Sequence, residues 1–317
     1  MKWMTRAGLL LATTMLLVAP LAAIARQAEP VAKAAQAPPV PLLWKVSGAQ
    51  GSAVYLLGSF HMLKPTDYPV SADVDAAFSA SRRLLFELSP EEMGSPQLAT
   101  QMLQAALRRD GRQLKDDLDD ATWQQLQAWA ADNNMPVERL AGLKPWFVGL
   151  TISIAQMARQ GLDPQSGLDR HLMERAAKAG KPTDGLESAA AQISMLDGMS
   201  VEEQRQLLRE ALEQADEGDA QSRRLHDAWR RGDDGVLWRD MAAQMKRQYP
   251  ELYRRINVER NDAWLPLLQP WLQQGQGDTL VVVGALHLLG SDGVVEKLRA
   301  RGYKVERICS ACKPAKR

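Results

Sequence analysis

Cysteine and histidine are scarce in this chain of 317 residues. The only two cysteines, Cys309 and Cys312, form one C-x-x-C near the C-terminus. A zinc knuckle would need a second cysteine pair. A catalytic dithiol usually begins a helix after a strand, whereas this pair precedes a segment of Lys, Pro and Ala. We therefore predict a small-loop disulfide between Cys309 and Cys312, as is common in exported proteins.

An excess of charge of either sign is also missing. The 39 basic and 38 acidic residues give a formal net charge of +1 at pH 7. Binding to nucleic acid that is driven by bulk charge is therefore not expected. The hydrophobic content of 45% and the charged content of 24% are those of an ordinary globular protein. The length fits one large domain or two modest ones.

Residues 1–25 have the pattern of a secretory signal peptide. Two basic residues precede an apolar segment at 9–18, which is too short to span a bilayer comfortably, and residues 23–25 (AIA) form a small-x-small cleavage site. We predict export to a bacterial periplasm or beyond, with no stable membrane anchor after cleavage. The alternative is an uncleaved membrane anchor. Residues 26–41, rich in Ala, Gln and Pro, are predicted to be a disordered linker.

Strand-like segments occur at both ends of the remaining chain. They cover residues 42–46, 53–57, 83–88, 279–283 and 303–308. Residues from about 97 to 274 have mostly helical patterns, interrupted by a possible short strand at 181–186. We predict an α/β domain over residues 42–308, with a mixed sheet formed by its N- and C-terminal segments and a large, mostly helical insertion. Residues 309–317 form a C-terminal tail.

Two of the four histidines occur in the same local pattern. His61 and His287 each stand three residues after a glycine that ends an apolar run. Glu87 ends a third apolar run. Sites in open α/β sheets collect beyond the carboxyl ends of strands, and glycine allows an abrupt turn there. We therefore expect the three side chains to converge, with the strand at 279–283 in the same sheet as those at 53–57 and 83–88 and the helical insertion excluded to one side.

Two imidazoles and one carboxylate are a standard ligand set for a catalytic divalent metal. Such a metal lowers the pKa of bound water so that hydroxide forms near neutral pH. Glu87 is either a third ligand or the general base for that water, and the sequence leaves both roles open. The alternative for His61 and His287 is that they cap strands through hydrogen bonds to the backbone.

The chain resembles the TraB/GumN family, which is related to the Tiki metalloproteases and more distantly to erythromycin-esterase-like and ChaN-like proteins. The resemblance covers residues 42–308. It rests on LLWKV (42–46), YLLGSFH (55–61) with LKP (63–65), Glu87, GLD (167–169), GLE (185–187) with Gln192, ERN (259–261) with Trp264, VGALHLLG (283–290) and LRARGYKV (298–305). In the Tiki relatives both G-x-x-H histidines and the strand glutamate form the active site, with manganese or cobalt favoured. The resemblance therefore implies His61, Glu87 and His287 as metal ligands, with zinc also possible.

Four further residues are candidates for the site. Arg260 and Asn261 are expected to point into it, where Arg260 orients a substrate carboxylate, or Arg260 or Asn261 stabilises an oxyanion. The alternative is a structural Arg–Glu pair. Asp169 and Glu187, each two residues after a glycine, are predicted to hydrogen-bond to the metal ligands without binding the ion themselves. Asp169 could equally cap a helix.

The remaining two histidines, His171 and His226, are expected at the surface without a role in the site. The expected function is an exported metal-dependent hydrolase, and within that class a peptidase, acting on a peptide or small-molecule substrate. The alternative is a non-catalytic periplasmic binding protein that uses the same pocket for a metal, haem or small molecule. The sequence leaves the substrate, the metal and the oligomeric state open.

Overall fold

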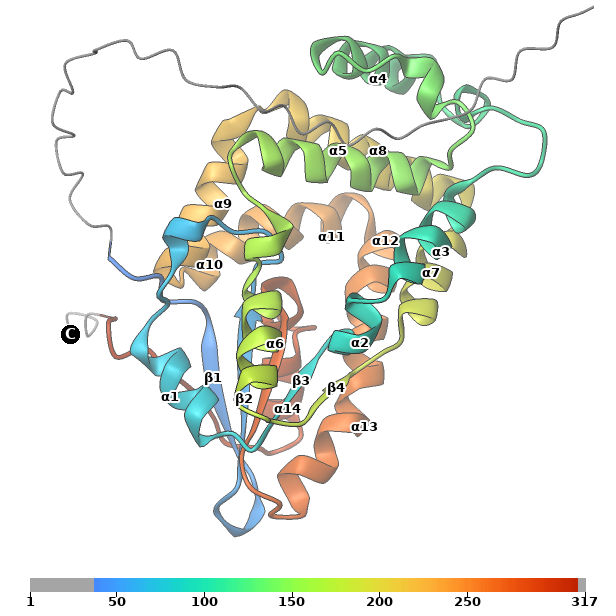
Figure 1. Cartoon of the computed structure of the whole chain (residues 1–317). Coiled ribbons are helices and arrows are strands. Elements are labelled where there is room, and N and C mark those ends of the chain that lie inside the picture. The colour runs from blue at the N-terminus through green and yellow to red at the C-terminus, as the bar shows by residue number, and fades with distance from the viewer. Residues whose placement is uncertain (1–36, 313–317) are drawn as a thin grey trace, which may run out of the picture. The chain divides into compact units, whose positions relative to one another are not determined.

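The computed structural model describes residues 37–312 of the chain (Figure 1). The signal peptide predicted at residues 1–25 lies outside this range. So do residues 26–36 of the predicted linker and residues 313–317 of the predicted tail. Among the described residues, no helix is long and apolar enough to cross a membrane.

The end of the predicted linker belongs to the folded domain. Pro39 and Pro41 are buried. The carbonyl of Pro39 accepts a hydrogen bond from Ser71 N at 2.8 Å, and Val40 N donates to the carbonyl of Arg230 at 2.7 Å. The prediction of disorder is therefore wrong for the last three residues of that segment. Their partners come from distant parts of the chain, which local composition does not reveal.

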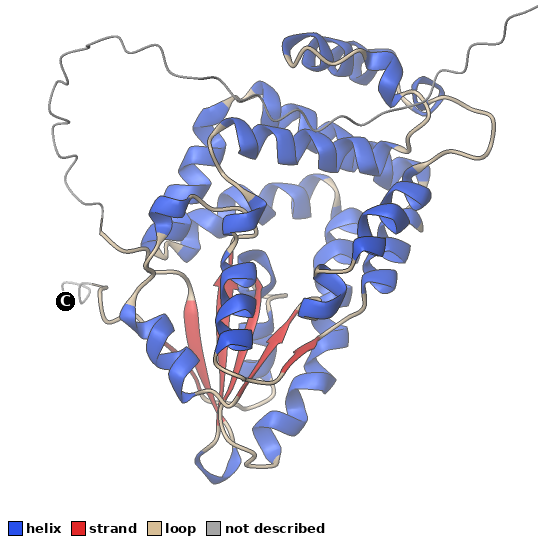
Figure 2. Ribbon diagram, viewed as in Figure 1, coloured by secondary structure: helices blue, strands red, loops and turns tan. Residues whose placement is uncertain are grey.

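One mixed sheet of six strands forms the centre of the domain (Figure 2). Its strands are β1 Leu43–Ser47, β2 Ala53–Ser59, β3 Arg83–Phe86, β4 Thr183–Gly185, β5 Thr279–Gly284 and β6 Val305–Arg307. The order is β4-β3-β5-β2-β1-β6. β2, β3, β4 and β5 run parallel, and β1 is antiparallel to β2 and β6. The predicted mixed sheet of an α/β domain is confirmed.

β5 lies between β2 and β3 and pairs in parallel with both. Its last residue, Gly284, is opposite Ser59 at the end of β2. The prediction that the strand at residues 279–283 joins the earlier strands in one sheet is therefore confirmed. β2 and β5 are buried along their whole length, which is why they are continuous apolar runs rather than alternating ones.

Helices cover both faces of the sheet. Figure 1 shows α1 (Ala72–Ala80) and α6 (Leu168–Lys178) in front of it, and α13 (Glu259–Gln273) and α14 (Val294–Ala300) behind it. α6 contacts β3 and α13 contacts β2, so the insertion supplies helices to both faces as well as β4. The expectation that the insertion is excluded to one side is therefore wrong, because parallel strands need an apolar cover on both faces.

A second group of helices has a core of its own. α4 (Asp120–Asp132), α5 (Pro145–Arg159) and α8 (Val201–Asp216) pack through buried side chains such as Trp129, Ile152 and Leu212. Figure 1 shows α5 and α8 crossing above the sheet. This group accounts for much of the predicted helical insertion.

Short helices connect these layers. They are α2 Pro90–Met93, α3 Pro96–Ala106, α7 Ala189–Asp197, α9 Asp219–Arg231, α10 Asp234–Leu237, α11 Gln244–Gln248, α12 Pro250–Tyr253, the π-helices η6 Trp238–Ala243 and η7 Arg254–Val258, and the 3-10 helices η1 Ala49–Gly51, η2 Pro65–Asp67, η3 Leu114–Asp117, η4 Val137–Leu140, η5 Pro164–Ser166 and η8 Ala285–Leu288. η7 runs directly into α13, which begins with two of the predicted site residues, Arg260 and Asn261, in its first turn.

Candidate functional site

Four polar side chains lie just beyond the carboxyl ends of the four parallel strands. His61 follows β2, Glu87 follows β3, Glu187 follows β4 and His287 follows β5. The ends of parallel strands meet along one edge of a sheet, where ligand sites of open α/β sheets form. The structure thereby brings together residues that are widely separated in the sequence.

Glu87 is at the centre of this group. Its Oε1 atom lies 3.9 Å from Nε2 of His61 and 3.9 Å from Nε2 of His287. The side chains of Glu87 and His287 are buried, with 12% and 7% of their surface exposed, whereas that of His61 is 57% exposed. The group is therefore open to solvent on the side of His61.

Gly284 keeps space free between these side chains. A Cβ atom at this position would lie 3.2 Å from both Glu87 Oε1 and His61 Nε2. Its backbone N–H donates to Glu87 Oε1 at 2.7 Å. The backbone angles of Gly284, φ −51° and ψ 137°, are open to any residue. The expected reason for this glycine, an abrupt turn, is therefore wrong, and the reason is the space that a side chain would fill.

Asp169 holds the ring of His61. This aspartate is buried in the first turn of α6, and its Oδ1 lies 3.2 Å from Nδ1 of His61. Leu168 N donates to the carbonyl of Phe60 at 3.0 Å, which ties the start of α6 to the loop that carries His61. The Nε2 atom of His61 is thereby turned towards Glu87.

Asn261 holds the ring of His287. The side chain of Asn261 is fully buried, and its Nδ2 donates to the carbonyl of Asp292 at 2.8 Å. Its Oδ1 therefore faces His287 Nδ1, at 2.8 Å, and accepts the proton on that nitrogen. The lone pair of His287 lies on Nε2, on the side of Glu87.

Arg260 lies between two glutamates. Its Nη2 donates to Glu87 Oε2 at 2.5 Å, and its Nε donates to Glu187 Oε1 at 3.0 Å. Gln192 Nε2 also donates to Glu187, at 2.8 Å. Arg260 Nη1 stands 3.1 Å from His287 Nε2. The two predicted roles of Arg260, site residue and partner in an Arg–Glu pair, therefore coincide in one side chain.

Trp264 packs on this arginine and on His287. Its ring centre is 4.5 Å from that of His287, and the guanidinium carbon of Arg260 lies 5.1 Å from the Trp264 ring. In the sequence, Trp264 belongs to the motif that carries the family resemblance but is not predicted to contact the site. Its spacing of four residues from Arg260, which places both on one side of α13, is the signal that could have revealed this contact.

Burial and neighbouring charges set the protonation of the group. Burial alone would raise the pKa of Glu87, but the charge of Arg260 and the two imidazoles hold it well below its usual range. Burial lowers the pKa of His287 to about 3, helped by the charge of Arg260. Desolvation of the ring side that faces the protein would lower the pKa of His61, but the charge and hydrogen bond of Asp169 outweigh it and raise that pKa above its usual value. Near pH 7, Glu87 is ionised and His287 is neutral.

The donor atoms suit a divalent ion in type and nearly in spacing. Two atoms bound to one ion at about 2.1 Å each cannot be more than about 4.2 Å apart, and both distances to Glu87 Oε1 are 3.9 Å. Within residues 37–312, however, no group of three or more His, Cys, Asp or Glu side chains is arranged to hold an ion. Arg260 bonds to Glu87 Oε2 and faces His287 Nε2, which are atoms that an ion would need.

A model of the TraB/PrgY/gumN family matches residues 42–307. The chain belongs to this family. The resemblance that the motifs predict is therefore confirmed, over nearly the same residues. Neither curated proteins nor solved structures gave a match to the chain.

A pocket of ≈ 380 Å³ opens beside the site of this TraB/PrgY/gumN family member. His61, Glu87 and Asp169 form one wall of the pocket, and apolar side chains form most of the rest. The pocket gives the site a space in which a ligand can contact both polar and apolar surface.

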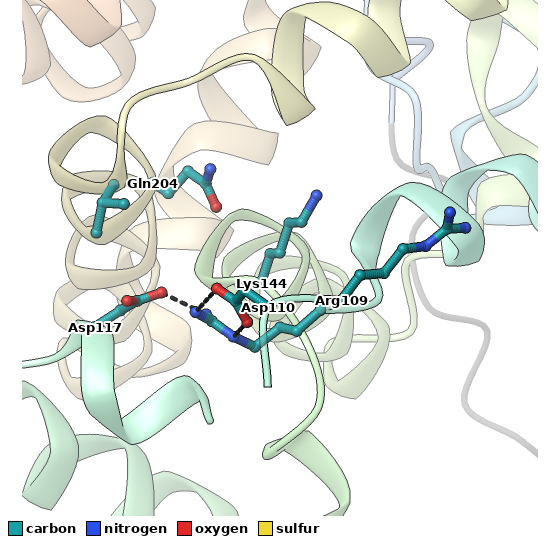
Figure 3. A pocket seen from close by; sticks show the side chains of 7 residues that line it. Arg109, Asp110, Asp117, Lys144 and Gln204 are labelled. Carbon is teal, nitrogen blue, oxygen red and sulfur yellow. Dashed lines mark hydrogen bonds and ion pairs between the residues drawn. The ribbon is translucent and has the colours of Figure 1, made fainter. Parts of the chain in front are cut away.

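A second hollow, of ≈ 420 Å³, lies at Arg108, Asp117, Lys144 and Gln204 (Figure 3). Four of its charged groups, Arg108, Asp110, Asp117 and Lys144, are paired with one another or with neighbours. Arg108 bonds to Asp110 and Asp117, and Lys144 pairs with Asp197 at 2.5 Å. Dashed lines in Figure 3 end on the labelled Asp110 and Asp117. None of the predicted site residues lines this hollow, so it is separate from the candidate site of the family fold.

The two other histidines have structural contacts. His171 is half-buried and packs on Tyr68, with ring centres 4.2 Å apart. His226 is buried, and its Nε2 lies 2.8 Å from Oδ2 of Asp67, which also pairs with Arg230. The expected surface position of His226 is therefore wrong, because a carboxylate from the distant N-terminal segment covers it.

Cys309 and Cys312 are joined by a disulfide, with their Cα atoms 5.3 Å apart. Ser310, inside this small loop, donates through its backbone N to Asp73 Oδ2 at 2.7 Å. Asp73 lies in the first turn of α1. The start of the predicted tail is thus attached to the helix that covers the front of the sheet.

Proposed function

We propose that the protein is a metal-dependent hydrolase that cleaves peptide bonds, with His61, Glu87 and His287 as the residues that hold the ion. The observation that carries this proposal is the placement of both imidazole Nε2 atoms 3.9 Å from one oxygen of Glu87. Each imidazole is fixed through its other nitrogen, by Asp169 or Asn261. Outer hydrogen bonds of this kind orient histidine ligands in metal sites.

The chemistry of the donors limits the choice of ion. Two imidazole nitrogens and one carboxylate oxygen suit manganese, cobalt or zinc, and the family resemblance favours manganese or cobalt. When bound, such an ion activates water and polarises the carbonyl of the substrate. Gly284 leaves room between the donors, since a side chain there would contact Glu87 and His61.

Glu87 acts as a ligand rather than as the general base in this proposal. Its Oε1 accepts from Gly284 N and its Oε2 from Arg260, so both oxygens already have strong donors. These contacts hold its pKa low. A carboxylate of low pKa is a poor proton acceptor near neutral pH.

Arg260 stabilises negative charge on the substrate. Its guanidinium stands beside His287 Nε2 and is anchored by Glu187. A fixed cation next to the reacting carbonyl lowers the energy of an oxyanion. Asn261 acts through His287, which it orients.

The proposal includes export of the protein from the cytoplasm. The pattern of residues 1–25 is that of a signal peptide. The Cys309–Cys312 disulfide is of the kind that persists in oxidising compartments such as the bacterial periplasm. We therefore place the hydrolase in the periplasm or beyond.

A second candidate function is a non-catalytic binding protein that uses the same pocket for a metal, haem or small molecule. One observation favours it. Arg260 bonds to Glu87 and faces His287, so the donors of the site are partly engaged within the protein. Donors that are already bonded to an arginine within the protein are less available to a reacting ion, which favours binding without chemistry.

Metal analysis and peptide hydrolysis separate the two functions. The purified protein is loaded with manganese, cobalt or zinc, and bound metal and cleavage of a mixed peptide library are measured. We expect one ion per chain and metal-dependent cleavage, both lost in His61→Ala plus His287→Ala and both kept in His171→Ala. Full metal binding by the double variant would overturn the ligand assignment. Stoichiometric metal without cleavage of any peptide would favour the binding protein.

A further inference from the structure

The pocket beside the candidate site has a wall of apolar side chains from several elements. Phe86 ends β3, Met93 ends α2, Leu98 lies in the first turn of α3 and Met173 lies in α6. These elements meet only in the folded domain. The wall is therefore built by the tertiary structure beside His61 and Glu87, which line the same pocket.

The apolar wall has a fixed part and an adaptable part. Phe86 is almost fully buried, and Met173 is 7% exposed, so both are held by the core. Met93 and Leu98 are only half-buried and form the part nearest to solvent. Methionine side chains adjust to ligands of different shape because they are unbranched and polarizable. The pocket therefore suits apolar groups of several shapes rather than one particular compound.

The size of the pocket limits what it holds. Its ≈ 380 Å³ is near the lower end of the range of about 300–1,000 Å³ found for small-ligand pockets. It takes one large side chain together with the adjoining peptide unit. A long stretch of substrate has to continue outside the pocket, across the open side at His61.

We propose that this pocket selects substrates by binding one bulky apolar side chain, such as Leu, Met or Phe, next to the peptide bond that is cut. The proposal rests on the proposed peptidase function, because it places that bond at His61 and Glu87. The apolar wall continues directly into the polar wall, so a side chain bound in the pocket brings its own peptide unit to the site. Arg170 and Gln192 also line the pocket. Against the apolar wall, neutral polar side chains such as Gln are disfavoured, because their amide groups lose water there without gaining a partner.

Leu98 is the position that tests the pocket with the least risk to the fold. Leu98→Gln places a polar group on the wall, and Leu98→Trp fills part of the space. Leu103 is the matched control, since it lies on the same helix, is 47% exposed and does not line the pocket. Thermal melts of the three variants establish that each is folded.

The first measurement is kcat/KM of the metal-loaded protein on peptides that differ only in one residue, which is Leu, Phe, Ala or Gln. We expect the Leu and Phe peptides to be cleaved at least about tenfold better than the Ala and Gln peptides. Leu98→Gln should lose about tenfold on the Leu and Phe peptides and less than about twofold on the Ala peptide. Leu98→Trp should lose most on Phe, and Leu103→Gln should match the parent protein.

The second measurement keeps the pocket proposal separate from the proposed function. Binding of the same peptides, carrying a fluorescent label, is measured on the His287→Ala protein, whose altered residue does not line the pocket. If the protein binds the Leu and Phe peptides preferentially and Leu98→Gln removes this preference, the pocket proposal is supported. If no metal gives cleavage in that case, only the hydrolase proposal is overturned. The pocket proposal is overturned if all four peptides are cleaved equally well, or if both Leu98 variants keep the preference for Leu and Phe. The hydrolase proposal is then still supported by the cleavage. Peptides that neither bind nor react overturn the pocket proposal as well.

Discussion

The guanidinium of Arg260 donates to Oε2 of Glu87 over 2.5 Å, although 173 positions separate the two residues. The contact joins the end of β3 to the first turn of α13. It neutralises a carboxylate that is only 12% exposed and whose other close donor is the uncharged backbone N–H of Gly284. The same arginine bonds to Glu187, so one cation pairs with two carboxylates at the edge of the sheet. Removing it should therefore affect both stability and function.

Arg260→Ala should lower kcat by about 10²–10³-fold, the usual effect of removing one group that stabilises an oxyanion. It should also lower the free energy of unfolding by about 3–5 kcal/mol, because it leaves buried carboxylates unpaired. Steady-state kinetics and denaturant unfolding measure the two effects. Arg175→Ala is the control, since its partner Asp75 is 49% exposed and such pairs contribute about 0–1 kcal/mol. An Arg260→Ala protein with full turnover would exclude Arg260 from the mechanism.

Asp169→Ala should weaken metal binding by about 10–100-fold, as is typical when the outer partner of a histidine ligand is removed. Asp169 contacts His61 through Nδ1 and does not need to touch the ion itself. Asp169→Asn keeps an acceptor for that nitrogen and should recover most of the affinity. Calorimetric titration with manganese measures the affinities. Equal losses in the Ala and Asn variants would show that the charge of Asp169, and not its hydrogen bond, matters.

The three central site residues are predictable because their signals are local. His61, Glu87 and His287 each follow an apolar run, and the ends of such strands meet at one edge of a parallel sheet. Asn261 as the partner of His287 is not predictable in this way. The contact spans 26 positions and depends on how α13 packs against β2, which no local pattern encodes.

Tertiary contacts decide two features that local patterns do not indicate. The polar neighbours of His226 indicate a surface position, but Asp67, 159 positions away, pairs with it in the interior. Likewise, proline usually ends a helix, whereas α13 continues through Pro266 to Gln273. The packing of Leu268 and Leu272 in the core offsets the hydrogen bonds that proline removes. In both cases tertiary contacts override local propensity.

Gly284→Ala should abolish metal binding without unfolding the protein. The added methyl group would lie 3.2 Å from both Glu87 Oε1 and His61 Nε2, in the space between the donors. Because the backbone angles of Gly284 are open to alanine, the melting temperature should change little. Gly142→Ala is the matched control, since a Cβ there meets no atom within 4 Å. Calorimetric titration and thermal melts are the measurements, and normal metal affinity in Gly284→Ala would place the ion elsewhere.

Asp67→Asn should destabilise the protein at pH 7 by about 3–5 kcal/mol, because it removes the buried carboxylate that pairs with Arg230 and His226. Burial alone would raise the pKa of Asp67, but hydrogen bonds from His226, the backbone N–H of Lys64 and Arg230 lower it. A carboxylate with a lowered pKa in the folded state contributes stability above its unfolded pKa of about 3.9, and this contribution is lost as the pH falls through the folded value. The difference between parent and variant should therefore be constant from pH 7 to about pH 5 and shrink below about pH 4.

Denaturant unfolding of parent and variant at a series of pH values measures this difference directly. Asp75→Asn is the matched control, because Asp75 pairs with Arg175 at the surface and is 49% exposed. Its effect should stay within about 1 kcal/mol at every pH.

Asp67 caps the short helix that follows the His61 loop, through its hydrogen bond to Lys64 N at 2.8 Å. A loss of stability in Asp67→Asn should therefore come with a loss of metal affinity, since the loop that carries His61 loses its anchor on α9. A destabilised Asp67→Asn protein whose metal affinity is unchanged would show that α9 supports the fold but not the site.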